Sequence, residues 1–270
     1  MINKSFYKSL AMMIEKETGI LYVESDYDRL IFRVKKLKEL LKVETDDELL
    51  NILQNAPSSN IQSLLVSTAT NNETSFFRDK KPFEVFCNHI IPEVFKSKKN
   101  RTLKIWSVAS STGQEPYSLA MKIKDTSFSF DFSVEICASD IDEEVLLKCK
   151  AGLYNQEEVQ RGLPIQFLSK YFDQITLTSW SVKNTIKELI NFFRFNLLTG
   201  VYPSNEYDII FCRNVLIYQS IENKTKVINN LFNALVPKGF LVLGGAENLI
   251  GIKSNFKTVT FDDFVVYIKE

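Results

Sequence analysis

Residues 103–119 read LKIWSVASSTGQEPYSL, and this stretch decides the fold. Its first half, 103–110, is an apolar run typical of a buried strand, and a short turn leads into the helix-like run EPYSLAMKI. Strand and helix keep alternating downstream. The further strands are expected at 133–140, 190–198, 207–212 and 239–245, followed by two adjoining β-rich runs, FKTVTFDDF and FVVYIK. This order predicts an α/β fold with a doubly wound sheet and a terminal antiparallel hairpin.

Two regions depart from this alternation. Residues 1–95 carry helical spacing and almost no strand signal, and the texture changes after residue 96, so a boundary is expected at 96–102. Residues 151–189 exceed what a direct helix-to-strand connection needs and contain the β-capable run ITLTSWSV. We therefore expect an all-helical N-terminal region and a small inserted β-subdomain.

Composition excludes several classes of function. Lys plus Arg and Asp plus Glu each number 33, so no global field attracts nucleic acid or an anionic membrane. The four cysteines are scattered and His89 is the one histidine, which argues against a metal site and against a histidine-dependent triad. No signal peptide and no apolar window of about 20 residues is present. A reduced, cytoplasmic location is expected.

Polar side chains gather where the predicted strands end. In an open parallel sheet these carboxyl ends form the ligand site. Asp140, after the second strand, can accept both hydroxyls of a ribose through charge-assisted hydrogen bonds. It can equally cap the helix that follows in ASDIDEE, and the sequence leaves both readings open.

The loop after the first strand narrows the choice of ligand. SVASSTGQEPYS has one glycine and no following Lys-Ser or Lys-Thr, so it is neither a dinucleotide fingerprint nor a Walker A loop. Glu115 stands where a phosphate-binding helix would present amide protons without a negative side chain. A nucleoside with a cationic tail, such as S-adenosylmethionine, suits this loop better than NAD, although spacing alone does not exclude NAD.

Several ordered segments together resemble one family, the chemotaxis receptor glutamate methyltransferases of the CheR type. They are NNETSFFRD (71–79), WSVASSTGQEPYSLAM, ASDID, FNLL, FCRNVLIY and LVLGGAENL. The resemblance covers nearly the whole chain. Departures from the family pattern are Ser110 for the usual cysteine, Gln114 for a frequent glutamate and Ala246 for a common serine.

The resemblance implies a Rossmann-like class I methyltransferase fold. It divides the chain into a helical domain with a hinge helix (1–80) and a catalytic domain (81–270) that carries the 151–189 insertion. The segment NNETSFFRD would be the hinge helix, with its aromatic rings packed against both domains. Contacts with S-adenosylmethionine are implied at Asn72, Thr74, Arg78, Ala109, Glu115, Asp140, Ile141, Asn196, Leu197, Arg213 and Asn214.

The implied reaction is methyl transfer from a sulfonium to a glutamate γ-carboxylate. Free glutamate has a pKa near ~4.3, so this nucleophile is ionised at neutral pH and needs no general base. Arg78, Arg213 and Tyr218 are the candidates to hold the incoming carboxylate. The alternative for Tyr218 is a half-buried aromatic that closes the sheet.

The resemblance also implies partners. The predicted helix 27–42 has a local charge of +4 (six basic minus two acidic residues) and would dock on the methylation helices of chemoreceptors, unless it is simply a solvated face. The insertion has no glycine in its FDQITLTSWSV run, so we expect no tethering to a receptor tail peptide. A monomer is expected. Methylation of another acceptor, or a non-catalytic S-adenosylmethionine-binding scaffold, are the competing hypotheses.

Overall fold

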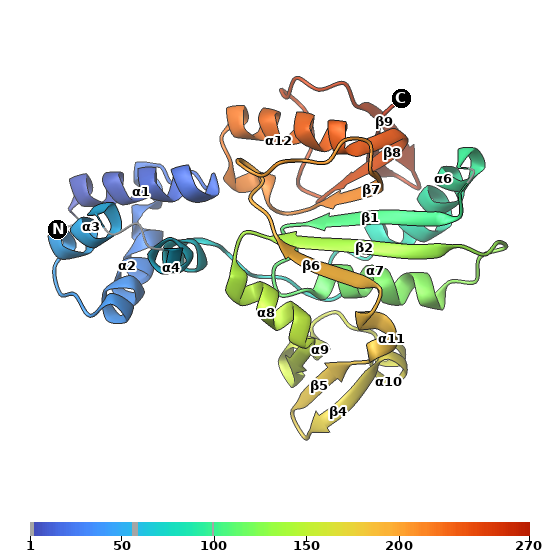
Figure 1. Cartoon of the computed structure of the whole chain (residues 1–270), viewed down its shortest axis with the longest axis horizontal. Coiled ribbons are helices and arrows are strands. Elements are labelled where there is room, and N and C mark those ends of the chain that lie inside the picture. The colour runs from blue at the N-terminus through green and yellow to red at the C-terminus, as the bar shows by residue number, and fades with distance from the viewer. Residues whose placement is uncertain (1–2, 56–58, 99) are drawn as a thin grey trace.

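A seven-stranded sheet organises the larger part of the chain (Figure 1). The structure is a computed structural model and describes residues 3–55, 59–98 and 100–270. In spatial order the strands are β6 (Ile190–Arg194), β2 (Ser133–Asp140), β1 (Thr102–Val108), β7 (Tyr207–Cys212), β8 (Leu235–Leu243), β10 (Phe264–Ile268) and β9 (Lys257–Phe261). Only β10 runs against its neighbours β8 and β9, and the chain order reverses between β1 and β7. The predicted doubly wound sheet with a terminal hairpin is confirmed.

Side chains alternate between the two faces of this sheet, as strand geometry requires. Ile209 and Phe211 of β7 join the hydrophobic cluster on one face, whereas Ile210 and Cys212 join the cluster on the other. The first face is covered by α5 (Lys81–Val85), a π-helical turn (Phe86–Ile90), α6 (Ile91–Ser97), α7 (Gln114–Asp125) and α8 (Glu143–Ala151), and the second by α12 (Ile221–Ala234).

Four helices before residue 70 form a separate bundle. They are α1 (Lys4–Thr18), α2 (Tyr27–Leu41), α3 (Asp46–Asn55) and α4 (Ser59–Ala69), with a short 3-10 turn at Glu24–Asp26. Gly19 closes α1 in a left-handed conformation, and Thr45 and Glu48 form reciprocal capping bonds at the start of α3. The bundle has its own core, which includes Leu10, Leu30 and Leu49.

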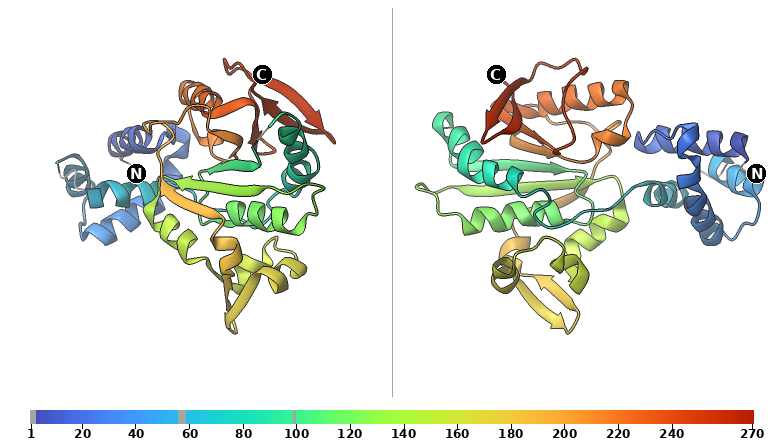
Figure 2. Two further views of the ribbon diagram at one scale, coloured as in Figure 1. Left: turned by 45° about the vertical axis from the view of Figure 1, so that its right-hand side comes forward. Right: turned by 180° about the vertical axis from the view of Figure 1, so that it is seen from behind.

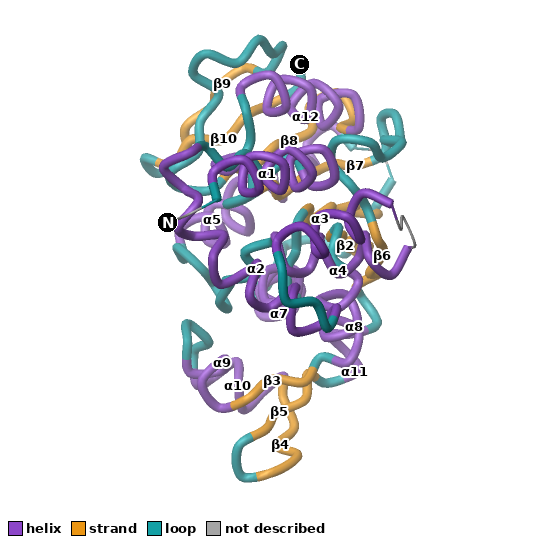
Figure 3. Tube along the Cα trace, turned by 90° about the vertical axis from the view of Figure 1, so that its left-hand side faces the viewer, coloured by secondary structure: helices purple, strands orange, loops and turns teal. Residues whose placement is uncertain are grey.

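The bundle lies beyond the carboxyl ends of the strands (Figures 2 and 3). Its contact with the sheet is made by backbone as well as side chains. The Leu21 amide donates to the Tyr218 carbonyl at 2.8 Å, and Ile20 forms an isolated antiparallel bridge with Gln219. The boundary expected at 96–102 is wrong, because helices α5 and α6 share the hydrophobic cluster of the sheet and the bundle core ends at Ala69.

The 151–189 insertion forms a small sheet of its own. It consists of β3 (Leu153–Asn155), β5 (Ser179–Val182) and β4 (Phe172–Thr176), in that order, with α9 (Gln156–Gln160), α10 (Ile165–Tyr171) and α11 (Asn184–Lys187). Gly162 packs on the segment after α4, where a Cβ would stand 2.2 Å from the Phe76 carbonyl oxygen. Any side chain there would push the subdomain away from that segment.

The expected hinge helix is wrong. Residues 71–75 have no regular structure and 76–79 form a turn in which Phe77 and Asp79 have positive φ angles of 48° and 67°. Backbone groups of this segment form hydrogen bonds with side chains distant in the chain instead of helical hydrogen bonds. The Phe77 amide donates to Ser118 Oγ, and the carbonyl of Asn72 accepts from Ser111 Oγ.

Both phenylalanine rings of this segment pack in the cluster of the sheet, so they do not join the two cores as expected. Phe76 is fully buried and contacts Tyr154 and Phe172 of the subdomain, and Phe77 contacts Phe167 of the subdomain as well as Phe83 of α5. Both rings therefore contact the inserted subdomain, and Phe77 also contacts α5. Within the described residues, no helix combines the length and the apolar composition needed to cross a bilayer.

Candidate active site

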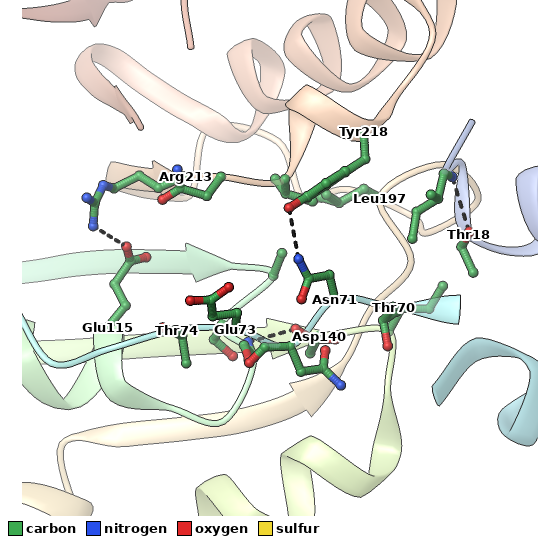
Figure 4. Close-up of a pocket in the computed structure, with 18 of the residues that line it drawn as sticks. Thr18, Thr70, Asn71, Glu73, Thr74, Glu115, Asp140, Leu197, Arg213 and Tyr218 are labelled. Atoms are coloured by element: carbon green, nitrogen blue, oxygen red, sulfur yellow. Dashed lines mark hydrogen bonds and ion pairs between the residues drawn. The ribbon is translucent and has the colours of Figure 1, made fainter. Parts of the chain in front are cut away.

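A pocket opens where the strand order reverses, between the sheet and the helical bundle (Figure 4). Its empty space is about 1000 Å³, including the part open to solvent. All twelve site residues predicted from the sequence line it: Asn72, Thr74, Arg78, Ala109, Glu115, Asp140, Ile141, Asn196, Leu197, Arg213, Asn214 and Tyr218. The fold thus brings together residues that are up to 146 positions apart in the chain.

Asp140 is held in place by backbone amides. One carboxylate oxygen accepts from the Ser111 amide at 2.8 Å and the other from the Asp142 amide at 3.1 Å. Burial raises the pKa of Asp140 to about 6, against the pull of those two hydrogen bonds. The helix-cap alternative is wrong, since Asp142 is the residue whose side chain caps α8, by accepting from the Glu144 amide.

The turns beside Asp140 use a strained backbone. Ala109 and Ser111 have φ angles of 52° and 50°, and Asn214, after β7, has 59°. Non-glycine residues in this region cost about 1 kcal/mol or more, and such strain concentrates at functional sites. The conformation turns the chain sharply at the ends of β1 and β7, where the Ser111 amide donates to Asp140 and the Asn214 amide donates to Glu247.

Arg213 is the buried ionic centre of the site. Its guanidinium donates to Glu115 and to Asp79, each at 2.8 Å, and to the Arg78 carbonyl at 2.9 Å, while its side chain is 2% exposed. Glu115 also accepts from Ser107 Oγ at 2.8 Å. Arg213 therefore joins the start of α7 to the 70–80 segment. Its role as a direct substrate ligand is hard to combine with these bonds.

Arg78 and Tyr218 are held more loosely. Arg78 is half-buried, and within the described part of the chain its guanidinium makes one long bond, 3.4 Å, to the Glu73 carbonyl. Tyr218 is half-buried in a 3-10 turn (Leu216–Tyr218), and its hydroxyl accepts from the Asn71 side-chain amide at 3.2 Å. These two polar groups are free to orient toward an incoming molecule.

Two predicted cofactor contacts already have protein partners. The Asn72 side chain donates to Asp142 at 3.1 Å, and this bond ties the 70–80 segment to α8. The Asn196 side chain donates to the Glu17 carbonyl at 2.9 Å and accepts from the Leu198 amide at 2.8 Å. Both residues shape the pocket wall through these bonds.

Sequence reasoning missed several residues of the site. Thr18, Ile20 and Gln219 line the pocket and come from the contact between the bundle and the sheet, which no local pattern announces. Glu247, after β8, supports the pocket residue Asn214 and accepts from five backbone amides, those of residues 214–217 and 244, at 2.6 to 3.3 Å. An acidic residue directly after a predicted strand end was the available signal for it.

The residues present fit S-adenosylmethionine. Glu73, Glu115 and Asp140 place three carboxylates around the space, which suits a sulfonium and an ammonium group. Within the described chain, three pocket residues also keep a buried polar atom without a hydrogen-bond partner: Ser110 Oγ, Arg213 Nε and Gln219 Oε1. Buried polar groups are normally paired, so these atoms have hydrogen-bonding capacity that no described protein group meets. No group of three His, Cys, Asp or Glu side chains suited to a metal occurs among the described residues.

Comparison with known proteins agrees with this chemistry. The family described as "CheR methyltransferase, SAM binding domain" matches residues 72–265. The chemotaxis protein methyltransferase Cher2 of Pseudomonas putida is 34% identical over 97% of this chain and 96% of its own length. The chemotaxis protein methyltransferase of Vibrio parahaemolyticus is 36% identical over 98% and 97%, and that of Escherichia coli is 29% identical over 94% and 88%.

Among solved structures, a putative S-adenosyl-L-methionine-dependent methyltransferase of Methanococcus maripaludis is 11% identical, with a TM-score of 0.38 over 74% of this chain and 95% of that one. The family match and the full-length relatives carry the assignment. The sheet is that of a class I methyltransferase, the methyl donor is S-adenosyl-L-methionine, and the chain belongs to the CheR methyltransferase family.

Proposed function

We propose that this chain methylates glutamate side chains on the cytoplasmic domains of chemoreceptors, giving methyl esters. The relatives carry the name chemotaxis protein methyltransferase, which supports an acceptor in the chemotaxis system. One observation carries the proposal: a lightly held guanidinium, Arg78, shares the pocket with the carboxylates Asp140 and Glu115. Such a site can hold a cationic methyl donor and an anionic acceptor side by side.

The pocket walls suggest how the cofactor is oriented. Asp140 would accept the ribose hydroxyls through the lone pairs that its two amide donors leave free. Glu115 would face the ammonium end, and Asn196–Leu197 the adenine. Ala109, Ile141, Asn72, Thr74 and Asn214 complete the proposed contact set. When bound, the cofactor supplies an electrophilic methyl group.

The protein's own work is to orient the acceptor and to exclude water. A glutamate carboxylate is ionised at neutral pH, so the site needs no general base. Arg78 and the Tyr218 hydroxyl are proposed to hold this carboxylate. Arg213 is proposed to position Glu115 and the 70–80 segment through its buried hydrogen bonds. A loosely held Arg78 suits the role, because tight pairing would stabilise the ionised reactant more than the transition state.

The basic helix α2 is the proposed docking face for the acidic receptor helices. Two of its cations serve the bundle itself: Arg33 bonds the Thr68 and Thr70 carbonyls, and Lys38 pairs with Asp46 at 2.8 Å. The exposed Lys35, Lys36 and Lys42 then carry the proposed attraction. We also propose a monomer with domains 1–80 and 81–270 that acts in the cytoplasm without a receptor tail peptide.

The test is incubation with tritiated S-adenosylmethionine and receptor cytoplasmic fragments. Base-labile label on glutamate supports the proposal, whereas stable label on another acceptor, or binding without transfer, supports a competing function. For docking, the double variant Lys35→Glu and Lys36→Glu is compared with Lys124→Glu, an exposed lysine on α7. Charge reversal on α2 should raise KM for the receptor and leave cofactor affinity unchanged. Equal KM values in both variants would show that α2 does not take part in receptor docking.

A further inference from the structure

Gln219 occupies the seam between the helical bundle and the sheet. It follows the 3-10 turn that carries Tyr218, pairs with Ile20 in an antiparallel bridge, and is 7% exposed. Its carboxamide carbon lies 3.6 Å from the position a Cβ would take on Gly19, and Leu198 Cδ1 lies 2.8 Å from that same position. The carboxamide therefore stands beside the loop that contains Asn196 and Leu197.

The carboxamide of Gln219 has an unmet hydrogen-bonding capacity. Among the described residues its Oε1 atom is buried and has no partner, although the residue lines the pocket. Leaving a buried carbonyl unpaired costs free energy, so a native site normally provides a partner. Rotation of the terminal amide by 180° exchanges its oxygen and nitrogen, which allows either atom to face the pocket.

Three other carboxamides of the pocket already take part in hydrogen bonds. Asn196 donates to the Glu17 carbonyl and accepts from the Leu198 amide, and Asn71 donates to Tyr218. Asn72 donates to Asp142. The Asn196 side-chain oxygen is therefore already used, whereas the Gln219 side-chain oxygen is available to accept a hydrogen bond.

We propose that Gln219 recognises the adenine ring of the cofactor, accepting from its 6-amino group and donating to the adjacent ring nitrogen. A glutamine carboxamide matches this donor and acceptor pair in adenine. The inference rests on the cofactor orientation proposed above, with adenine beside Asn196–Leu197. Gln219 would then determine specificity for the base of the cofactor. The residue that does so lies in the contact between the helical bundle and the sheet.

The test measures binding by calorimetry, without turnover. Two ligands are compared: S-adenosylhomocysteine and its analogue that lacks the 6-amino group. The original protein should prefer the amino form about tenfold, as expected for one such contact. Gln219→Met, which keeps size but removes both polar atoms, should bring the ratio close to one. Gln219→Glu keeps the acceptor oxygens and should retain a preference for the amino form at lower affinity.

The matched control is Gln174→Met on the exposed strand β4, which should keep the original ratio. Thermal unfolding of each variant shows whether the substitution destabilises the contact between the bundle and the sheet. A purely structural defect would lower the affinity for both ligands equally and leave their ratio unchanged. An unchanged ratio in Gln219→Met overturns the role of Gln219 alone. Failure of the original protein to bind S-adenosylhomocysteine overturns the proposed cofactor orientation as well.

Discussion

Asp140 should make the ligand-free protein less stable as the pH rises. The carboxyl has an ordinary pKa of 3.8 and a folded pKa of about 6, raised by burial. At ~1.4 kcal/mol per pKa unit, the difference corresponds to about 3 kcal/mol. Below 3.8 both the folded and the unfolded chain carry the proton and the group contributes no difference.

The sign follows from which state holds more protons. Between pH 3.8 and about 6 the unfolded chain releases the proton while the folded chain retains it, so the free energy of unfolding falls as the pH rises. Above about pH 6 both are ionised and the loss is complete. Asp140→Asn has no such titration. The stability of the original protein minus that of the variant should therefore drop by about 2 kcal/mol between about pH 4.5 and pH 7.5.

Urea unfolding of both proteins at matched ionic strength measures this difference. Trp106 is a suitable reporter because it is fully buried and its indole donates to Ser139, next to Asp140. The hydrogen bond that asparagine cannot make adds a constant at every pH and so leaves the slope untouched. A stability difference that stays flat across this pH range, or rises with pH, would refute the raised pKa of Asp140.

Four further outcomes are expected. The affinity for S-adenosylhomocysteine should increase as the pH passes about 6 and Asp140 ionises, and calorimetry on Asp140→Asn should give a flat profile. Arg213→Met should destabilise by about 3–5 kcal/mol, since it leaves Glu115 unpaired, whereas Arg78→Met should cost less than about 1 kcal/mol in the same urea assay; the reverse ranking would contradict our division of roles. Glu247→Ala should lower the free energy of unfolding by about 1–3 kcal/mol by stranding the amides it binds, and an unchanged urea midpoint would speak against that contact. Tyr218→Phe should lower kcat about tenfold or more with little change in cofactor affinity if its hydroxyl orients the acceptor, and unchanged kcat would return Tyr218 to a closing role.

The hydrophobic pattern predicted the strands of the sheet well, because a buried strand appears in the sequence as a short run of apolar residues. The apolar runs at 133–140 and 207–212 coincide with β2 and β7, and the final hairpin is where the two adjoining runs placed it. Strand ends were less predictable. The run at 190–198 forms a strand only to Arg194, because residues 195–197 leave the sheet to form the pocket wall and Asn196 bonds α1. Strand β8 begins at Leu235, four residues before the expected start.

By itself, the sequence determined where the strands occur along the chain, which polar residues follow them and which charged residues are available to bind a cationic nucleoside. Each of these features depends on residues that are close together in the chain. Tertiary structure alone decided how those groups are used. Arg213 became a buried tie to Glu115 and Asp79, the segment 71–79 opened out of the expected helix, and Gln219 entered the pocket with Ile20. In each case the deciding partner lies far away in the chain, so hydrogen bonding and burial there depend on contacts that only the completed fold creates.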